Sequence, residues 1–232
     1  MNAGGAILDL ALARSLAAPG DAPPPLYDLK LGPGDLALVD APDAAQSAWF
    51  ADLCCGLVPL AEGRVRFLGR DWAAMPHELG AALRGRIGRV FAIGGWIGFL
   101  DVATNILLPQ LHHTRGDLNE LRNRATGLAR TFGLPGLPLG RAIDLSPRDL
   151  ACASCVRAFL GDPVLLLLES PVSGQFSDLK APLIDAVAAA RGRGAAAIWF
   201  SRSDLVLRDR SFPASQRWRL AERGLVPIGH AA

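Results

Sequence analysis

The chain lacks the features that mark nucleic-acid-binding, secreted or membrane-spanning proteins. Its 24 basic and 22 acidic residues leave a net charge of +2, so no large basic field predicts nucleic-acid binding. Its five tryptophans are scattered and form no stacking ladder for single strands. No window of about 18 residues is free of charge, which predicts no membrane span. The apolar start carries Asp9 and Arg14 and has no basic signal-peptide region, so we expect a cytoplasmic protein.

Cysteine is scarce and lies in two close pairs, Cys54-Cys55 and Cys152 with Cys155. The second pair has a C-x-x-C spacing, but no second ligand pair accompanies it and it falls within a helical pattern. We therefore expect reduced thiols in helices and no metal site. The adjacent His112 and His113 are likewise expected to be solvated.

One apolar run anchors the predicted fold. Val164–Leu168 is entered from Gly161-Asp162-Pro163 and is followed by Glu169, a serine and a proline. It is too short for a free-standing helix and too apolar for a half-solvated strand, which favours a strand buried on both faces of a parallel sheet. In α/β proteins ligands bind at the carboxyl ends of such strands, so Glu169 is a candidate site residue.

Patterns elsewhere predict a single α/β domain over residues 1–232, since half of the residues are hydrophobic and can bury a sizeable core. The predicted strands are Ala6–Ala13, Leu26–Leu31, Leu36–Val39, Arg64–Leu68, Ile87–Phe91 and Ala195–Phe200, with a strand or hairpin near Arg217–Leu225. The predicted helices are Trp49–Leu57, His77–Arg86, Val102–Leu108 ending before Pro109, Asp117–Phe132, Leu150–Leu160 with Ser146 as N-cap, and Asp178–Arg191. Residues 93–160, approximately, are expected to form an inserted helical subdomain.

The strand Leu36–Val39, the following loop and the next helix have the frame of a phosphate-binding loop. Together with later landmarks, from about Leu29 to about Asp204, this order and spacing resemble the nucleotide-binding (ATPase) subunit of ABC transporters. The middle segment and Pro171-Val172-Ser173-Gly174-Gln175 look most like the ATPase subunit of Mla-type lipid transporters, which serve MCE proteins. The resemblance implies an ABC-type P-loop NTPase-like fold, with a mainly parallel core sheet, an N-terminal antiparallel β part and an inserted helical subdomain.

The chemistry of the phosphate-binding loop is largely missing. Such a loop needs glycines for close backbone approach, a lysine for charge and a hydroxyl for magnesium. The corresponding loop is degenerate: Asp40 at the first glycine, then Pro42 and Asp43, Ala45 at the second glycine, Gln46 at the lysine and Ser47 at the hydroxyl. Carboxylates about 4 Å from a phosphate cost on the order of 4 kcal/mol before screening, so we expect ATP binding to be severely weakened.

The other landmarks of the family are replaced as well. They are Ala92 at the Q-loop glutamine, Leu145-Ser146-Pro147-Arg148-Asp149 at the LSGGQ signature, Glu169 at the Walker B aspartate, Ser170 at the catalytic glutamate, Phe176 at the D-loop aspartate, Arg202 at the switch histidine, and no aromatic residue near Leu16 for adenine. A serine without a neighbouring base cannot activate water at neutral pH. Hydrolysis is therefore predicted to be lost, and no cofactor is expected.

The resemblance then implies a catalytically silent subunit that docks on a transporter permease or pairs with an active ABC ATPase subunit. Membrane contact would come only through the permease, peripheral to the inner membrane. The candidate docking residues are Ala92, Trp96, Ile97, Phe99 and Leu100, for which ordinary packing is an equal alternative. In a pair with an active subunit, Arg148 would face the partner's ATP, although Pro147 and Asp149 oppose an effective site.

Two other interpretations remain open from the sequence. A functional ATPase with divergent motifs would bind Mg-ATP through Ser47 and Glu169, with Glu169 also as base. A regulatory or scaffold protein would instead bind a new ligand in the old phosphate cleft, where Asp40, Asp43, Gln46 and Arg202 are the polar candidates.

Overall fold

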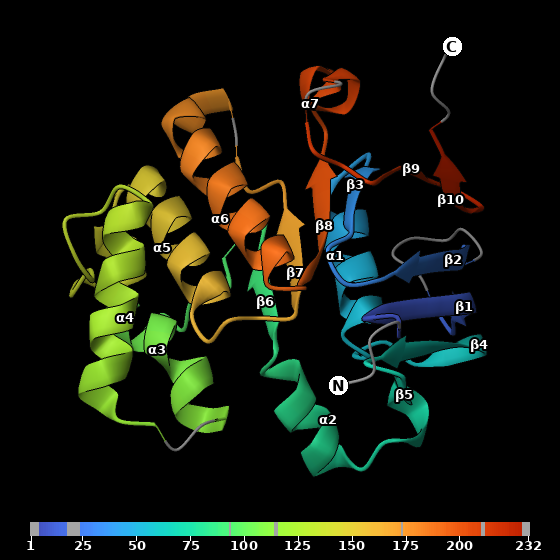
Figure 1. Cartoon of the computed structure of the whole chain (residues 1–232), viewed down its shortest axis with the longest axis horizontal. Helices are drawn as coiled ribbons and strands as arrows, with labels where there is room; N and C mark the ends of the chain where they lie inside the picture. The colour runs from blue at the N-terminus through green and yellow to red at the C-terminus, as the bar shows by residue number, and fades with distance from the viewer. Residues whose placement is uncertain are drawn as a thin grey trace.

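The computed structural model describes residues 5–17, 24–92, 94–113, 116–172, 174–209 and 212–228 (Figure 1). A ten-stranded sheet runs through it in the order β5-β4-β1-β2-β10-β9-β3-β8-β7-β6. The strands are β1 (Leu8–Ser15), β2 (Leu26–Leu31), β3 (Leu36–Asp40), β4 (Leu60–Phe67), β5 (Arg70–Asp71), β6 (Ile87–Val90), β7 (Leu165–Glu169), β8 (Ala196–Ser201), β9 (Gln216–Ala221) and β10 (Gly224–Pro227). The predicted α/β class, with a mainly parallel core and an antiparallel N-terminal part, is confirmed.

The core strands β3, β8, β7 and β6 pair in parallel. Every residue of β7 and β8 is buried, because helices or other strands cover both faces of this part of the sheet. Alternate side chains of β7 serve two cores: Leu166 and Leu168 pack into one hydrophobic cluster, and Leu165 and Leu167 into another. The apolar run that anchored the prediction is thus the buried central strand.

The antiparallel part is formed by β1, β2, β4 and β5. In β2 buried and more exposed residues alternate, as expected for a strand with one face toward water. The predicted hairpin near Arg217–Leu225 is confirmed as β9 and β10, which lie between β2 and β3 and so join the two parts of the sheet.

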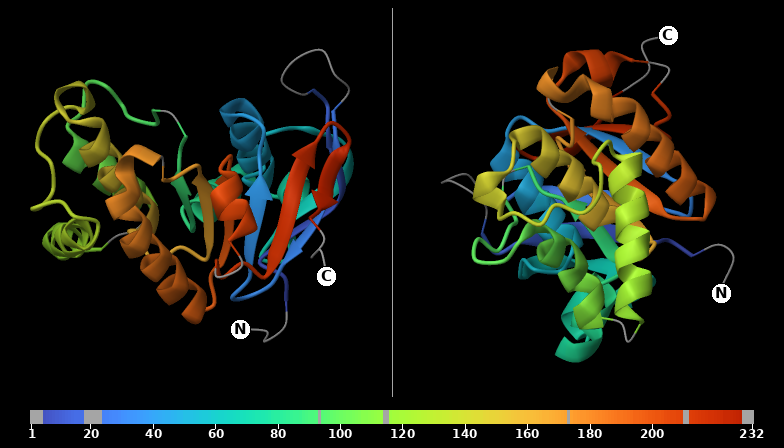
Figure 2. Two further views of the ribbon diagram at one scale, coloured as in Figure 1. Left: turned by 90° about the horizontal axis from the view of Figure 1, so that it is seen from above. Right: turned by 90° about the vertical axis from the view of Figure 1, so that its left-hand side faces the viewer.

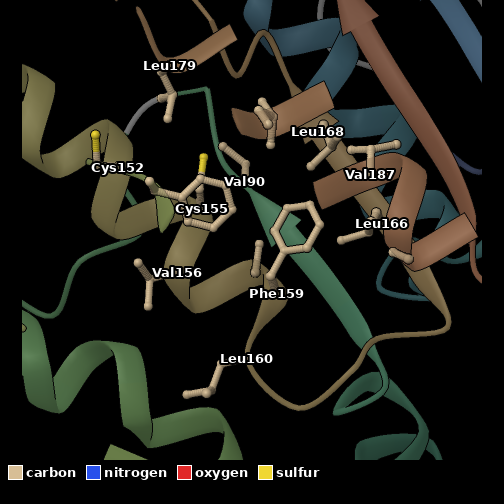
Figure 3. Close-up of a cluster of buried hydrophobic side chains, with 14 of the residues drawn as sticks. Val90, Cys152, Cys155, Val156, Phe159, Leu160, Leu166, Leu168, Leu179 and Val187 are labelled. Carbon is tan, nitrogen blue, oxygen red and sulfur yellow. The ribbon is translucent and has the colours of Figure 1, made fainter. Parts of the chain in front are cut away.

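The helices are α1 (Ala44–Cys54), α2 (His77–Arg84), α3 (Val102–His113), α4 (Leu118–Thr131), α5 (Pro147–Phe159), α6 (Lys180–Gly192) and α7 (Asp204–Arg208). In both Figure 1 and Figure 2, α3, α4 and α5 lie at the opposite end of the molecule from β1, β2 and β4. Figure 3 shows one core cluster, in which Cys155 and Phe159 of α5 meet Val90 of β6, Leu166 of β7 and Val187 of α6. Helix α1 packs into the other cluster, on the other side of the sheet.

Helices α1 and α3 differ most from their predicted bounds. Helix α1 starts at Ala44, ahead of the predicted Trp49, because Asp43 caps its N-terminus. Helix α3 was predicted to end at Leu108, but it continues through Pro109 to His113. The prediction was wrong because burial of Val102 and Ile106 stabilises α3 and outweighs the hydrogen bond that proline removes.

Two smaller expectations, on the N-cap of α5 and on the cysteines, are confirmed. Ser146 is the N-cap of α5, and its hydroxyl accepts a hydrogen bond from the Asp149 N–H. The cysteines are free and buried, and burial raises the pKa of each thiol. Within the described ranges, no helix is both long enough and apolar enough to cross a membrane.

Candidate functional site

The candidate site lies where the parallel strands β3, β8 and β7 end. Asp40 pairs in register with Ser201, and Glu169 pairs with Phe200, so the last residues of these strands are neighbours. Helix α1 begins a few residues after β3 and places its N-terminus at the same edge of the sheet. In open α/β sheets this edge is where ligands bind.

A carboxylate of the chain itself occupies the N-terminus of α1. Asp43 has an extended backbone and its Oδ1 accepts a hydrogen bond from the Gln46 N–H at 2.8 Å. Its Oδ2 accepts a second bond from the Gln46 side-chain amide at 3.2 Å. A helix N-terminus attracts an anion through its free N–H groups and its dipole, and in a phosphate-binding loop that anion is the ligand. Here Asp43 supplies the negative charge.

The remaining polar residues of the loop are also engaged within the chain. Asp40 accepts a bond from Arg219 Nε of the adjacent strand β9 at 2.8 Å. The Ser47 hydroxyl lies within hydrogen-bond distance of the Ala44 and Asp43 carbonyls, at 3.0 and 3.3 Å, and Ser47 is 1% exposed. A serine has a single hydroxyl hydrogen, and both carbonyls within its reach belong to the preceding turn of the backbone. Pro42, Ala45 and Gln46 are exposed at the surface of the loop.

Glu169, which the resemblance places at the Walker B aspartate, is buried and paired with an arginine. Arg89 of β6 donates from Nε to Glu169 Oε1 at 2.5 Å, and the Ala92 N–H lies 3.3 Å from Oε2. The same guanidinium donates from Nη1 to Asp52 Oδ1 at 2.5 Å and from Nη2 to the Ala48 carbonyl at 3.2 Å. Burial favours the neutral form of Arg89, but the hydrogen bond with Asp52 and the charge of Glu169 outweigh it, so its pKa is raised.

These contacts test whether the residues fit a magnesium nucleotide. Both oxygens of Glu169 already accept hydrogen bonds, and the charge of the carboxylate is already balanced by the Arg89 guanidinium. Gln46 brings no positive charge to balance a phosphate, and the Asp43 carboxylate adds a negative charge at the N-terminus of α1. The residues present therefore do not fit Mg-ATP in the binding mode that the resemblance implies.

Among the described residues, Ser170, Phe176 and Arg202 are the ones that the resemblance places near Glu169 in the roles of base and neighbouring loop residues. Ser170 has a left-handed backbone with a φ of 47°, and its N–H donates to the Phe200 carbonyl at 3.1 Å. Arg202 is exposed beyond the end of β8, and Phe176 packs against the core. Neither a serine nor an arginine can accept a proton from water at neutral pH, so these positions give no means of activating a nucleophile.

The signature-like segment lies at the start of α5. Ser146 caps the helix, and Pro147 occupies its first turn. Arg148 donates from Nη2 and Nε to Asp178 Oδ2 at 2.6 and 3.0 Å, and this hydrogen bond lowers the pKa of Asp178. The segment is not brought together with the phosphate-binding loop, since α5 and α1 belong to different core clusters. Because it is bonded to Asp178, Arg148 is engaged within its own chain.

The candidate docking residues differ in how exposed their side chains are in the structure. Trp96 packs partly buried against the core, with the Arg157 guanidinium 4.4 Å from its ring centroid, so ordinary packing accounts for it. Ala92 and Leu100 are half-buried, and Ile97 is 37% exposed. Phe99 is 83% exposed, so packing against the core does not account for it.

Sequence reasoning missed two further exposed apolar residues, Leu139 (81%) and Ile143 (84%). Their segment runs beside that of Phe99, since Asp101 bridges Arg141 and the Val102 N–H donates to the Gly140 carbonyl. We call Phe99, Leu139 and Ile143 the apolar edge. The only signal in the sequence was two aliphatic residues in a Pro- and Gly-rich segment that fits no helical or strand period.

Comparison with known proteins supports the resemblance. No family model matches the chain. It is 26% identical over 144 residues to the lipoprotein-releasing system ATP-binding protein LolD of Pseudomonas syringae pv. tomato, covering 62% of this chain and 63% of that protein. It is 25% identical over 155 residues to the intermembrane phospholipid transport system ATP-binding protein MlaF of Haemophilus influenzae, covering 65% and 58%. These matches thus span less than two thirds of the length of each relative.

The fold has close counterparts among solved structures. The dimeric ATP-binding cassette MJ0796 in a post-hydrolysis state bound to ADP and Pi matches with a TM-score of 0.78 at 17% identity, covering 94% of this chain and 96% of that one. The ADP conformation of the cassette MJ1267 matches with a TM-score of 0.70 at 18% identity, covering 96% and 90%. The chain therefore has the ABC cassette fold, and its resemblance to the ATPase subunits of ABC transporters is confirmed.

Proposed function

We propose that the chain is a nucleotide-independent, non-hydrolysing subunit of an ABC-type transport complex. The observation that carries this proposal is the pairing of Glu169 with Arg89 at 2.5 Å, because it gives the Walker B carboxylate a partner within the chain. The Asp43 carboxylate at the N-terminus of α1 supports it at the neighbouring end of β3. With its charges satisfied internally, the fold serves for docking rather than for catalysis.

The apolar edge is the proposed docking surface. Three large apolar side chains that are more than 80% exposed are unusual neighbours on a soluble surface and favour an interaction partner. Burying each of them would contribute about 1.5–3 kcal/mol of binding free energy. The partner is a transporter permease, or an active ATPase subunit of the same complex, and the chain sits at the cytoplasmic face of the inner membrane through that partner.

The transported substrate is proposed to be a lipid or a lipid-bearing molecule. This rests on the two kinds of relative, one from a lipoprotein-releasing system and one from an intermembrane phospholipid transport system. A working ATPase would require Glu169 to exchange Arg89 for a metal ion, and a scaffold with a new ligand in the cleft would require the Asp40 and Asp43 contacts to open.

Two measurements on the purified chain test the proposal. Calorimetric titration with Mg-ATP up to about 1 mM, beside a hydrolysis assay, is expected to give neither binding heat nor turnover. Micromolar binding of Mg-ATP, with or without turnover, would overturn the nucleotide-independent assignment.

The docking surface is tested by co-purification from detergent-solubilised membranes. The parent is compared with Phe99→Asp/Ile143→Asp and with Val226→Asp, a control at a side chain that is 48% exposed on β10. A permease or ATPase subunit, identified by mass spectrometry, is expected with the parent and the control and at least tenfold less with the double variant. Equal recovery with all three chains would rule out the apolar edge.

A further inference from the structure

Arg89 connects three elements of the fold, α1, β6 and β7. From β6 its guanidinium reaches Asp52 and the Ala48 carbonyl on α1, and Glu169 at the end of β7. Its side chain is 11% exposed and that of Glu169 is 1% exposed, so this contact is sheltered from water. The ring of Phe91 lies 4.4 Å from the guanidinium carbon and covers one face of the group.

The chemistry of this contact matches that of a bound cation. Asp52 and Glu169 offer carboxylate oxygens, and the Ala48 carbonyl adds a neutral oxygen; such hard oxygen ligands are those that a divalent ion prefers. A guanidinium satisfies them because its N–H groups point in several fixed directions within one plane. A lysine ammonium, being a point charge on a flexible stem, does not match this arrangement.

We propose that Arg89 is a resident cation that balances Glu169 and Asp52 in place of the divalent metal that the resemblance implies, and that it fixes α1, β6 and β7 relative to one another without a ligand. This inference rests on the proposed function in one respect, namely that the chain works without a magnesium nucleotide. It adds a specific role for Arg89 and Asp52, two residues outside every motif of the family resemblance. The arrangement of these three elements is then preset by the chain.

Replacing Arg89 with an uncharged residue would leave Glu169 and Asp52 without their positively charged partner. Glu169 would keep a buried and uncompensated charge, which is strongly destabilising, whereas neutralising both partners removes that penalty. The two released carboxylates, Asp52 and Glu169, would also become available to a metal ion in solution. A metal should therefore stabilise a chain that lacks Arg89 and have no such effect on the parent.

The experiment compares the thermal unfolding of four chains in EDTA and in excess MgCl₂: the parent, Arg89→Met, Arg89→Met/Glu169→Gln and Arg84→Met. Arg84 is the matched control, since its guanidinium bonds the Cys55 and Gly56 carbonyls at 2.9 and 3.0 Å. In EDTA, Arg89→Met is expected to melt roughly 6–20 °C below the parent, and the double variant to recover most of that loss.

The response to magnesium separates a resident cation from an ordinary ion pair. At ten times the dissociation constant, Mg²⁺ should raise the melting temperature of Arg89→Met by roughly 3–6 °C. It should not shift the parent, the double variant or Arg84→Met. An equal Mg²⁺ effect on all chains, or an Arg89→Met chain as stable as the parent, would overturn the proposal.

If Arg89→Met cannot be purified, Arg89→Lys replaces it. The lysine variant is expected to melt between the parent and the range given for methionine, and unchanged stability would contradict the role of the guanidinium. The result is independent of the nucleotide titration. A parent chain that binds Mg-ATP would refute the proposed function, while the variant series still measures the Arg89 contact directly.

Discussion

The internal anion at the N-terminus of α1 leads to a quantitative prediction about nucleotide binding. Asp43 lies 2.8 Å from the Gln46 N–H, so a phosphate bound there would meet a like charge at close range. That repulsion would cost about 1 kcal/mol if both charges are fully hydrated and about 4 kcal/mol if they are half-buried. Asp40 opposes a phosphate less, because Arg219 neutralises it at 2.8 Å. A lysine in place of Gln46 would add about 1.5–3 kcal/mol through a charged hydrogen bond.

The restored loop Asp40→Gly/Asp43→Ser/Ala45→Gly/Gln46→Lys should therefore gain about 2.5–7 kcal/mol of ATP binding, which is roughly 10²- to 10⁵-fold in affinity. Serine is chosen at position 43 because it caps helices as well as aspartate does. The gain is measured by calorimetric titration with ATP, with and without magnesium. Binding should not depend on magnesium, since Arg89 still holds Glu169 in this variant.

The control is Asp117→Ser, which makes the same change at the N-cap of α4, where Asp117 accepts a bond from the Glu120 N–H at 2.9 Å. It should leave ATP binding unchanged. A restored loop that folds, with the circular dichroism of the parent, yet binds ATP no more tightly would refute the charge argument. So would a parent chain that already binds ATP at micromolar concentration.

Two further predictions concern stability. Leu167→Ala, at a fully buried position of β7, should cost about 2–5 kcal/mol in urea unfolding, whereas Leu139→Ala, at a residue 81% exposed, should cost less than about 0.5 kcal/mol; similar losses would contradict the assigned burial. The hydrogen bond with Arg148 depresses the pKa of Asp178 in the folded chain below its value of about 4 in the unfolded chain. The pair therefore contributes its full stabilisation above about pH 4 and loses it as the pH falls through the lower pKa of the folded chain. Asp178→Asn should flatten this part of the stability curve, and unchanged slopes would argue against the pair.

Local patterns were sufficient for most of the fold. The run Val164–Leu168 predicted a buried strand because its apolar residues end sharply at glycine, proline and acidic residues. Ser146 predicted a helix start because its side chain bonds its own helix, and the structure has that bond. The bounds of α1 and α3 were harder to predict. At Asp43 a cap was missed, and at Pro109 tertiary packing outweighs the local preference.

The loss of motif chemistry could be read from residue types alone. A glutamine at position 46 has no positive charge in any fold, and a serine at position 170 has no basic carboxylate. What replaces that chemistry could not be read, because the Arg89 contacts join residues separated by 37 and 80 positions. The same holds for the apolar edge, because the Asp101–Arg141 bridge and the bond from the Val102 N–H to the Gly140 carbonyl bring together two segments that are distant in the sequence.

The sequence by itself therefore determined the class of fold. It also showed that the side chains that usually bind a nucleotide are replaced, since both conclusions follow from side-chain chemistry at fixed spacings along the chain. The tertiary structure decided how the remaining charges are satisfied. Parallel pairing of β6 with β7 brings Arg89 to Glu169, and the packing of α1 over the sheet adds Asp52. Long-range contacts of this kind depend on strand order and helix placement, which no local pattern specifies.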